Sequence, residues 1–214
     1  SRAVSELIIA EILNLLRNLN DHHDSTKRGL WKPVAGDQLS GKTVGIIGCG
    51  QVGQDLAKLL RSFECKVLAF DKRRLTSFYK THQVTPTELN TLLGSADIVT
   101  IHVPLTSETE NLIGHNQLNL MKPSAILLNA ARGGIVNEPA LELALTNGII
   151  RGAALDVFEI EPTTQRRLLA LDNFLCTPHI GGSTHEAVLA MGLAAIEGLD
   201  SNTVPTDHFV SEHS

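Results

Sequence analysis

Three glycines, Gly48, Gly50 and Gly53, form the pattern G-x-G-x-x-G between a largely apolar run and a segment with helical spacing. The run at 42–47 is typical of a strand that is buried on both faces of a sheet. The segment at 51–63 has the periodicity of a helix. Glycines at such a junction permit a tight turn, let the backbone approach a ligand and let the helix pack closely on the strand. The pattern therefore favours a strand–turn–helix unit within a parallel α/β fold.

Strands and helices alternate along the rest of the chain, because apolar runs are separated by capping residues and helical spacing. The predicted strands are 66–70, 97–103, 125–129, 152–155 and 174–176, and the predicted helices are 115–121, 137–146 with Asn137 as its cap, one that begins at 85–88 (T-P-T-E) and one from 183–186 (S-T-H-E) to about Glu197. This order predicts a doubly wound parallel sheet, the Rossmann fold. Ahead of the first strand, residues 1–19 predict an amphipathic helix and residues 20–40 a polar loop.

The glycine pattern has the context that a dinucleotide site requires, since Asp71 ends the next strand. Residues Gln51 and Val52 lie within the glycine pattern, where free N–H groups of the helix N-terminus would face the pyrophosphate. Asp71 would accept a hydrogen bond from the ribose 2′-hydroxyl and repel a 2′-phosphate, which favours NAD over NADP. Lys72, Arg73 and Arg74 follow it directly. They weaken that preference, although a solvated basic turn is the simpler explanation for them.

Composition excludes several other classes of protein. The 214 residues are 43% hydrophobic and 19% charged, with a net charge of -5 and no massed basic stretch, so nucleic acid is not an expected partner. No apolar run approaches the roughly 20 residues that span a bilayer. Cys49, Cys65 and Cys176 are an odd number without a C-x-x-C pair, which favours free thiols and a cytoplasmic protein. The sequence has no H-x-x-x-H or H-E-x-x-H pair, so a metal site is not expected.

Three motifs in the second half of the chain bear most of the chemistry. They lie at 129–136 (N-A-A-R-G-G-I-V), 155–162 (L-D-V-F-E-I-E-P) and 177–184 (T-P-H-I-G-G-S-T). In sequence, order and spacing they resemble the arginine, glutamate and histidine motifs of the D-isomer-specific 2-hydroxyacid dehydrogenases. The similarity runs from Ser1 to about Val210 and is strongest to the branch that resembles phosphoglycerate dehydrogenase.

The resemblance implies that Arg132, Glu161 and His179 are catalytic. A 2-keto acid needs a proton on its carbonyl oxygen as it accepts a hydride, and a histidine supplies such a proton near neutral pH. Glu161 would fix the tautomer of His179 and stabilise its imidazolium form. Arg132 would bind the substrate carboxylate, to which its planar fork is suited. Taken singly, each residue also has a structural explanation, as a loop ion pair, a solvated charge or a turn histidine.

The same resemblance implies further contacts with NAD. Asp156 would receive the nicotinamide carboxamide, and other residues would line the coenzyme: His102, Val103, Pro104, Thr109, Ala131, Arg132, His179 and Gly181. His102 as a strand-end residue and Thr109 as a helix-start hydroxyl are the competing explanations. Asn137 stands where the family often has aspartate; since either residue caps a helix, we expect little consequence.

The resemblance also implies a division into domains. Residues 1–182 would form the dinucleotide-binding domain, and residues 183–214 would be the helix and tail of a substrate domain whose larger part precedes Ser1 in family members. We therefore expect the chain to bind NAD but to turn over its 2-keto acid poorly. The resemblance also implies a homodimer through the cofactor domain, joined by the helix whose apolar stripe runs from Val4 to Leu19. Packing of that stripe on its own sheet is the alternative, and the two are compatible. A coenzyme-sensing protein related to transcriptional corepressors is the alternative function, since fold alone cannot separate the two.

Overall fold

The computed structural model describes residues 1–200, with side chains described as far as Ile196. Within that part of the chain, seven parallel strands form one sheet in the order β3-β2-β1-β4-β5-β6-β7. The strands are β1 (Thr43–Ile47), β2 (Lys66–Phe70), β3 (Val84–Pro86), β4 (Ile98–Ile101), β5 (Ile126–Asn129), β6 (Gly152–Leu155) and β7 (Phe174–Cys176). The predicted Rossmann sheet is confirmed. Its order reverses between β1 and β4, where open α/β sheets bind their ligands at the carboxyl ends of the strands.

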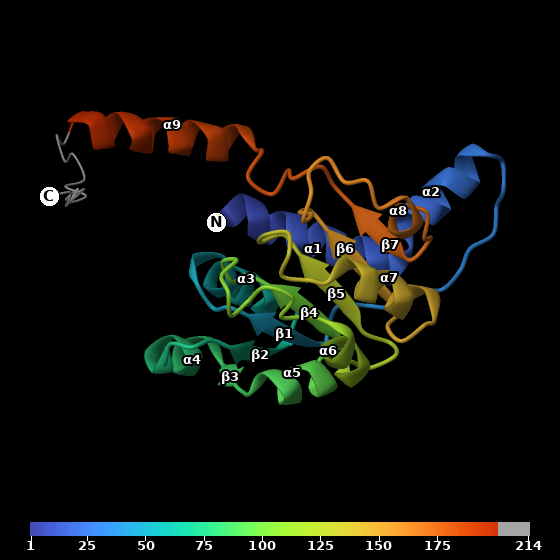
Figure 1. The fold of residues 1–214 in the computed structure, drawn as a ribbon, viewed down its shortest axis with the longest axis horizontal. Coiled ribbons are helices and arrows are strands. Elements are labelled where there is room, and N and C mark those ends of the chain that lie inside the picture. Colours follow the sequence, from blue (N-terminus) through green and yellow to red (C-terminus); the bar gives the residue numbers. More distant parts are fainter. Residues whose placement is uncertain (201–214) are drawn as a thin grey trace, which may run out of the picture.

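Helices cover both faces of the sheet (Figure 1). On one face lie α1 (Arg2–Arg17), α3 (Gln51–Arg61) and α4 (Thr76–His82), and on the other lie α5 (Leu89–Ser95), α6 (His115–Leu120), α7 (Glu138–Thr146) and α8 (Arg166–Leu169). Each face has its own apolar core. Ile8 and Ile12 of α1 are fully buried against the first face, which explains why the predicted amphipathic helix forms there.

The cap predicted for α7 is confirmed, because Asn137 Oδ1 accepts a hydrogen bond of 2.9 Å from the N–H of Ala140. The helix predicted to begin at 85–88 is wrong. Val84–Pro86 instead form β3, in which Thr85 pairs with Leu68, and α5 begins only at Leu89. The T-P-T-E pattern matches a capping box, but proline is also tolerated on an edge strand, where no N–H is required of it.

The polar loop predicted at 20–40 is wrong in its first half, where α2 (Leu19–Lys27) forms. None of its residues is buried, so no apolar stripe marks it in the sequence. The helices α4 and α8 were not predicted either, because with 7 and 4 residues they are too short to show a helical periodicity. The third predicted strand, 97–103, is shorter in the structure, since β4 ends at Ile101 and His102 opens the following loop.

Helix α9 (His185–Asp200) stands apart from the body of the molecule (Figure 1). Thr184 caps it, since its Oγ1 accepts a hydrogen bond of 3.1 Å from the N–H of Ala187. Its large apolar side chains are exposed, each by half or more: Val188, Leu189, Met191, Leu193 and Ile196. The predicted tail beyond residue 200 lies outside the described residues. An apolar helix without a neighbour in the described part of the chain has a surface suited to another protein segment.

Candidate active site

The glycine loop lies at the carboxyl end of β1, and each glycine meets a different constraint. Gly48 has φ of 92°, and a Cβ there would lie 2.7 Å from Val103 Cγ1. A Cβ on Gly53 would lie 2.3 Å from the carbonyl oxygen of Gly48, so only glycine lets α3 pack so closely on the strand. The space beside Gly50 is open, since a Cβ on it would have Arg73 Nη2 as its nearest atom, at 3.8 Å. The loop thus leaves room for a phosphate over exposed backbone, which fits a dinucleotide.

Asp71 lies beside this loop, at the end of β2. Its Oδ2 accepts a hydrogen bond of 2.7 Å from the N–H of Cys49 and one of 2.9 Å from Arg73 Nη2. Its Oδ1 accepts bonds from the backbone and the Nε of Arg73, at 2.7 and 3.0 Å. Burial alone would raise the pKa of Asp71, but these hydrogen bonds hold it below its ordinary value. Asp71 is therefore an ionised acceptor, and Arg73 already pairs with it.

Two cavities run along the carboxyl edge of the sheet. The larger, of about 650 Å³, lies between Asp71 at the end of β2 and the loop after β4. The smaller, of about 300 Å³, shares His102, Val103 and Pro104 with it. From there it reaches three residues of the loop after β5, Ala130, Ala131 and Arg132, and it is also lined by Val4 and Val52. Predicted cofactor residues from four strand ends, those of β1, β2, β4 and β5, therefore line one continuous stretch of surface.

Two of the predicted cofactor residues also have structural partners. Thr109 Oγ1 donates a hydrogen bond of 2.6 Å to the carbonyl of Pro104 and accepts one of 2.8 Å from the N–H of Thr106, so it shapes the loop after β4. His102 Nε2 lies 2.9 Å from Thr100 Oγ1. Burial lowers the pKa of His102 to about 4, so its ring is neutral at pH 7. A neutral ring is suited to line the part of the cavity that faces an uncharged portion of a ligand.

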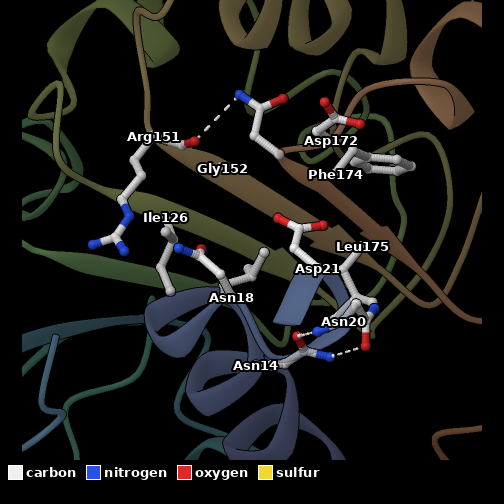
Figure 2. Close-up of a pocket in the computed structure, with 12 residues that line it drawn as sticks. Asn14, Asn18, Asn20, Asp21, Ile126, Arg151, Gly152, Asp172, Phe174 and Leu175 are labelled. Carbon is white, nitrogen blue, oxygen red and sulfur yellow. Dashed lines mark hydrogen bonds between the residues drawn. The ribbon is translucent and has the colours of Figure 1, made fainter. Parts of the chain in front are cut away.

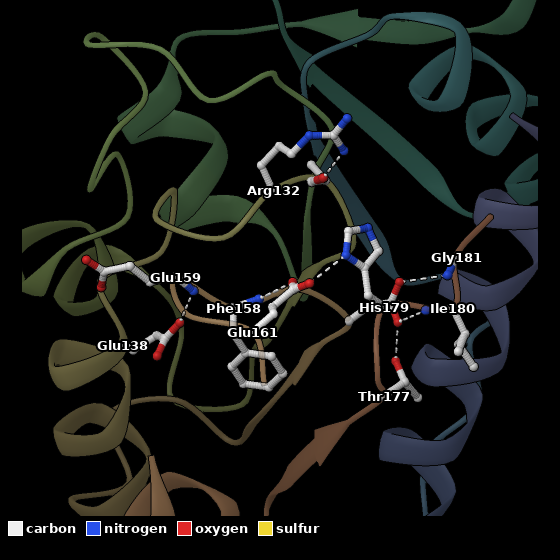
Figure 3. Close-up of polar contacts among 11 residues, drawn as sticks. Arg132, Glu138, Phe158, Glu159, Glu161, Thr177, His179, Ile180 and Gly181 are labelled. Carbon is white, nitrogen blue, oxygen red and sulfur yellow. Dashed lines mark hydrogen bonds and ion pairs between the residues drawn. The ribbon is translucent and has the colours of Figure 1, made fainter. Parts of the chain in front are cut away.

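The predicted glutamate and histidine meet directly (Figure 3). His179 Nδ1 lies 2.8 Å from Glu161 Oε2, and Glu161 Oε1 accepts a hydrogen bond of 3.0 Å from the N–H of Phe158. The hydrogen bond from His179, followed by that from Phe158, lowers the pKa of Glu161. An ionised Glu161 accepting from Nδ1 leaves the opposite ring nitrogen, Nε2, as the one that can exchange a proton with a substrate.

Arg132 approaches the same pair from the loop after β5. Its positive charge contributes to lowering the pKa of Glu161, and its Nη1 donates a hydrogen bond of 2.6 Å to the carbonyl of Ala131 (Figure 3). The loop is fixed by Asn129, whose side chain is buried. Its amide donates to the carbonyl of Arg132 at 2.9 Å and accepts from the N–H of Ala131 at 3.0 Å. The structure thus brings the three predicted catalytic residues together.

Asp156 has a structural task of its own. It is 1% exposed and accepts three hydrogen bonds of 2.6–2.7 Å, from Thr177 Oγ1 and from the N–H groups of Ile180 and Gly181. Between these donors lies His179, whose φ of 56° is unusual for a residue with a side chain. Asp156 therefore holds the histidine loop in a strained backbone conformation.

Two features of the site escaped prediction from the sequence. Glu138 is buried at the start of α7 and accepts a hydrogen bond of 2.7 Å from the N–H of Glu159, in the loop that bears Glu161. Gly133 contacts the same loop, because a Cβ on it would lie 1.9 Å from the carbonyl oxygen of Phe158. Glu138 carries no local signal, since acids are common in the first turn of any helix. Gly133 lay inside the arginine motif, but its contact needs the folded loops.

A polar pocket lies at the opposite edge of the sheet (Figure 2). It is lined by the first residues of β5, β6 and β7 and by the junction of α1 and α2, where Asn14 Nδ2 donates 3.0 Å to Asn20 Oδ1. Its volume is about 70 Å³, the space of roughly two waters. It is far too small for a dinucleotide, and it faces away from the carboxyl ends of the strands, where parallel sheets bind ligands.

Residues 1–200 contain neither a cluster of metal-ligating side chains nor a helix suited to span a membrane. No group of three or more His, Cys, Asp or Glu side chains there is arranged to hold a metal ion. Nor does any helix in this range have the length and apolar character needed to cross a bilayer.

The sheet order, the glycine loop and the cavity along the carboxyl edge define a dinucleotide-binding domain with an acid–base pair at one end. Comparison with known proteins gives the family. Residues 9–181 match the sequence model described as "D-isomer specific 2-hydroxyacid dehydrogenase, NAD binding domain", so the chain belongs to that family. The predicted resemblance and the predicted cofactor, NAD, are confirmed.

Relatives and solved structures agree with this assignment. The chain is 42% identical over 200 residues to a D-3-phosphoglycerate dehydrogenase of Methanocaldococcus jannaschii, with 92% of this chain and 38% of the relative covered. It is 38% identical to a hydroxypyruvate reductase of Thermotoga maritima, covering 91% of this chain and 64% of that one. The structure resembles D-lactate dehydrogenase with NAD+ from Lactobacillus jensenii, with a TM-score of 0.85, 30% identity and coverage of 92% and 64%. The chain thus spans only part of the length of these proteins.

Proposed function

We propose that the chain is the coenzyme-binding part of an enzyme that transfers a hydride between NAD(H) and a D-2-hydroxy acid or its 2-keto acid. The contact of 2.8 Å between His179 Nδ1 and Glu161 Oε2 carries the proposal, because it leaves a ring nitrogen available beside Arg132. The relatives named above are dehydrogenases and reductases, which supports an enzyme over the alternative of a coenzyme-sensing protein.

In the proposed reaction, the glycine loop and Asp71 would hold NADH, which when bound would supply a hydride to carbon 2 of the keto acid. His179 gives its Nε2 proton to the keto oxygen as that oxygen gains negative charge, and Glu161 stabilises the imidazolium before the transfer. Arg132 holds the carboxylate of the substrate through its guanidinium. In the reverse direction His179 takes the hydroxyl proton. The proposed coenzyme contacts are Gly48, Gly50, Gln51, Val52, Gly53, Asp71, His102, Val103, Pro104, Thr109, Ala131, Arg132, Asp156, His179 and Gly181.

Binding and turnover can be tested separately. The chain should bind NADH in a fluorescence titration, and the variant His179→Asn should still bind it, because the glycine loop and Asp71 are unchanged. Turnover with a panel of 2-keto acids should be slow, because the chain spans part of its relatives' length. Any turnover should vanish in His179→Asn. Absence of NADH binding, or turnover that survives this substitution, contradicts the proposal.

Further proposals concern organisation. We place the domain boundary near residue 182, so that residues 183–214 belong with a substrate domain, and the location is cytoplasmic. A homodimer through α1 is also proposed, on the support that Val4, Ile9 and Leu13 keep part of their apolar surface accessible beside the buried stripe. Sedimentation at micromolar concentration should give a dimer, and replacing Ile9 by Asp should yield a monomer. A monomer at all concentrations excludes this arrangement.

A further inference from the structure

Glu11 is a buried acid that the proposed reaction does not use. It lies on the face of α1 that packs on β5 and β6, and it is 2% exposed. Neither of its carboxylate oxygens has a hydrogen-bond partner among the described residues. An ionised carboxylate without donors is very costly in such surroundings, so the group must either carry a proton or find a partner.

The charged group that acts on Glu11 is a second acid, Asp156. Asp156 accepts three hydrogen bonds, whereas Glu11 accepts none, so the negative charge belongs on Asp156. Burial first, and then the charge of Asp156, raise the pKa of Glu11 to about 8, while Thr177 acts in the opposite direction. From α3, Asp55 is the charged residue that reaches α1, and it is paired with Arg2 at 2.7 Å.

Thr177 bonds to one of the two acids and offers no donor to the other. Its single hydroxyl proton is donated to Asp156 Oδ1 over 2.6 Å, and no hydrogen bond joins it to Glu11. Because the hydroxyl has no further proton to donate, an ionised Glu11 would gain no donor from Thr177. The packing nevertheless joins α1 to the histidine loop, since a Cβ on Gly181 would lie 3.0 Å from Asp156 Oδ2 and 3.5 Å from Val4 Cγ2.

We infer that Glu11 is a positioning residue: it is a neutral carboxylic acid, and its proton keeps a second negative charge out of the buried contact between α1 and the loop that bears His179. Asp156 can then carry the single charge that accepts the three hydrogen bonds holding His179 at its positive φ. The inference adds to the proposed function, because it explains what keeps the histidine in place beneath the coenzyme.

Infrared spectroscopy tests the protonation state without any coenzyme. The chain should show the carbonyl band of a protonated carboxylic acid at neutral pH, and that band should be absent from Glu11→Gln. Glutamine keeps the shape and an N–H donor while it cannot ionise. Identical spectra for the two proteins in this region overturn the inference, whatever the chain's catalytic activity.

Coenzyme binding tests the positioning role. In the unmodified chain, the Kd for NADH should rise about tenfold as the pH passes from well below to well above 8, because an ionised Glu11 would repel Asp156 and loosen the histidine loop. Glu11→Gln should show less than about twofold change that is attributable to this group, and Glu11→Leu should bind weakly at every pH. Equal pH dependence in the unmodified chain and Glu11→Gln overturns the role. If Glu11→Leu does not fold, the comparison of the unmodified chain with Glu11→Gln still tests the positioning role.

Failure of the proposed function would look different. A chain that binds no NADH at any pH contradicts the coenzyme assignment, but the infrared comparison still reports on Glu11. A chain that binds NADH and lacks the acid band contradicts the inference alone. The two proposals therefore stand or fall on separate measurements.

Discussion

At the scale of single residues, the site depends on side chains that never touch a substrate. Asn129 closes the arginine loop through two hydrogen bonds to its backbone, and Asp156 closes the histidine loop through three. Both are almost fully buried, so each bond lost would leave a polar group without water as a replacement. The positions of Arg132 and His179 are thus set by two buried residues, Asn129 and Asp156, that fix the loops bearing them.

Replacing Asn129 by Leu should destabilise the fold by about 2–4 kcal/mol, because the carbonyl of Arg132 and the N–H of Ala131 would both lose their partner. Urea unfolding measures the change. Asn137→Asp is the matched control, since aspartate also caps α7 and should change stability by less than about 0.5 kcal/mol. Equal effects of the two substitutions would contradict this account of the arginine loop.

Glu11 gives a prediction for stability against pH. Its pKa in the folded chain, about 8, lies above the ordinary 4.5, so between these values the unfolded chain loses the proton and the folded chain keeps it. The unfolded state therefore binds fewer protons, and stability falls as the pH rises through this window, by on the order of 3–5 kcal/mol in all. Glu11→Gln lacks this contribution and should gain on the unmodified chain from about pH 5 to pH 8. Unfolding curves that stay parallel would refute it.

At the scale of elements, three adjacent strand ends assemble the catalytic residues. Arg132 follows β5, Glu161 follows β6 and His179 follows β7. The sequence predicted these strands closely because continuous apolar runs mark strands that are buried on both faces. It predicted the three side chains through the family motifs. Edge and surface elements were harder to predict. The proline of β3 belongs to a pattern that resembles a helix cap, and α2 has no buried face and so shows no apolar stripe.

The supporting contacts could not be predicted for a different reason. Glu11, Asn129 and Glu138 acquire their roles only when a residue distant in sequence arrives beside them. In the sequence, a buried acid on α1 is one polar residue in an apolar stripe, and its surroundings are known only once β5 and β6 pack against it. Local patterns therefore describe the strands well and the inner support of the loops poorly.

Gly133 joins two of these elements, and its replacement by Ala should be severe. The new Cβ would lie 1.9 Å from the carbonyl oxygen of Phe158, so the arginine and glutamate loops would have to separate. We expect a loss of about 3 kcal/mol or more. Thermal unfolding of Gly133→Ala, with Gly182→Ala as control, measures this, since a Cβ on Gly182 meets nothing within 4 Å. A small effect at Gly133 would show that the loops yield easily.

At the scale of the whole molecule, the described chain divides into a packed body and one helix outside it. The two apolar cores lie on either side of the sheet, and neither includes a residue of α9. The body therefore has what it needs to fold without that helix. The exposed apolar side chains of α9 suit a partner surface.

Ending the chain after Gly182 should accordingly leave the thermal unfolding midpoint and NADH binding nearly unchanged. It should also reduce association at high concentration, because the exposed apolar surface of α9 is removed. Calorimetry and light scattering on the two lengths of chain check both parts. A large fall in the midpoint would mean that α9 belongs to the body after all.

The pair of Asp71 and Arg73 has a consequence for how coenzyme enters. Both oxygens of Asp71 are occupied by Arg73 and by the N–H of Cys49, so a ribose that hydrogen-bonds there must compete with an internal cation. Affinity then reflects an exchange rather than a simple gain, and the guanidinium that is set free lies next to the open space above Gly50. A residue that formed an ion pair with Arg73 away from Asp71 would therefore raise the affinity for the coenzyme without contacting the nucleotide itself.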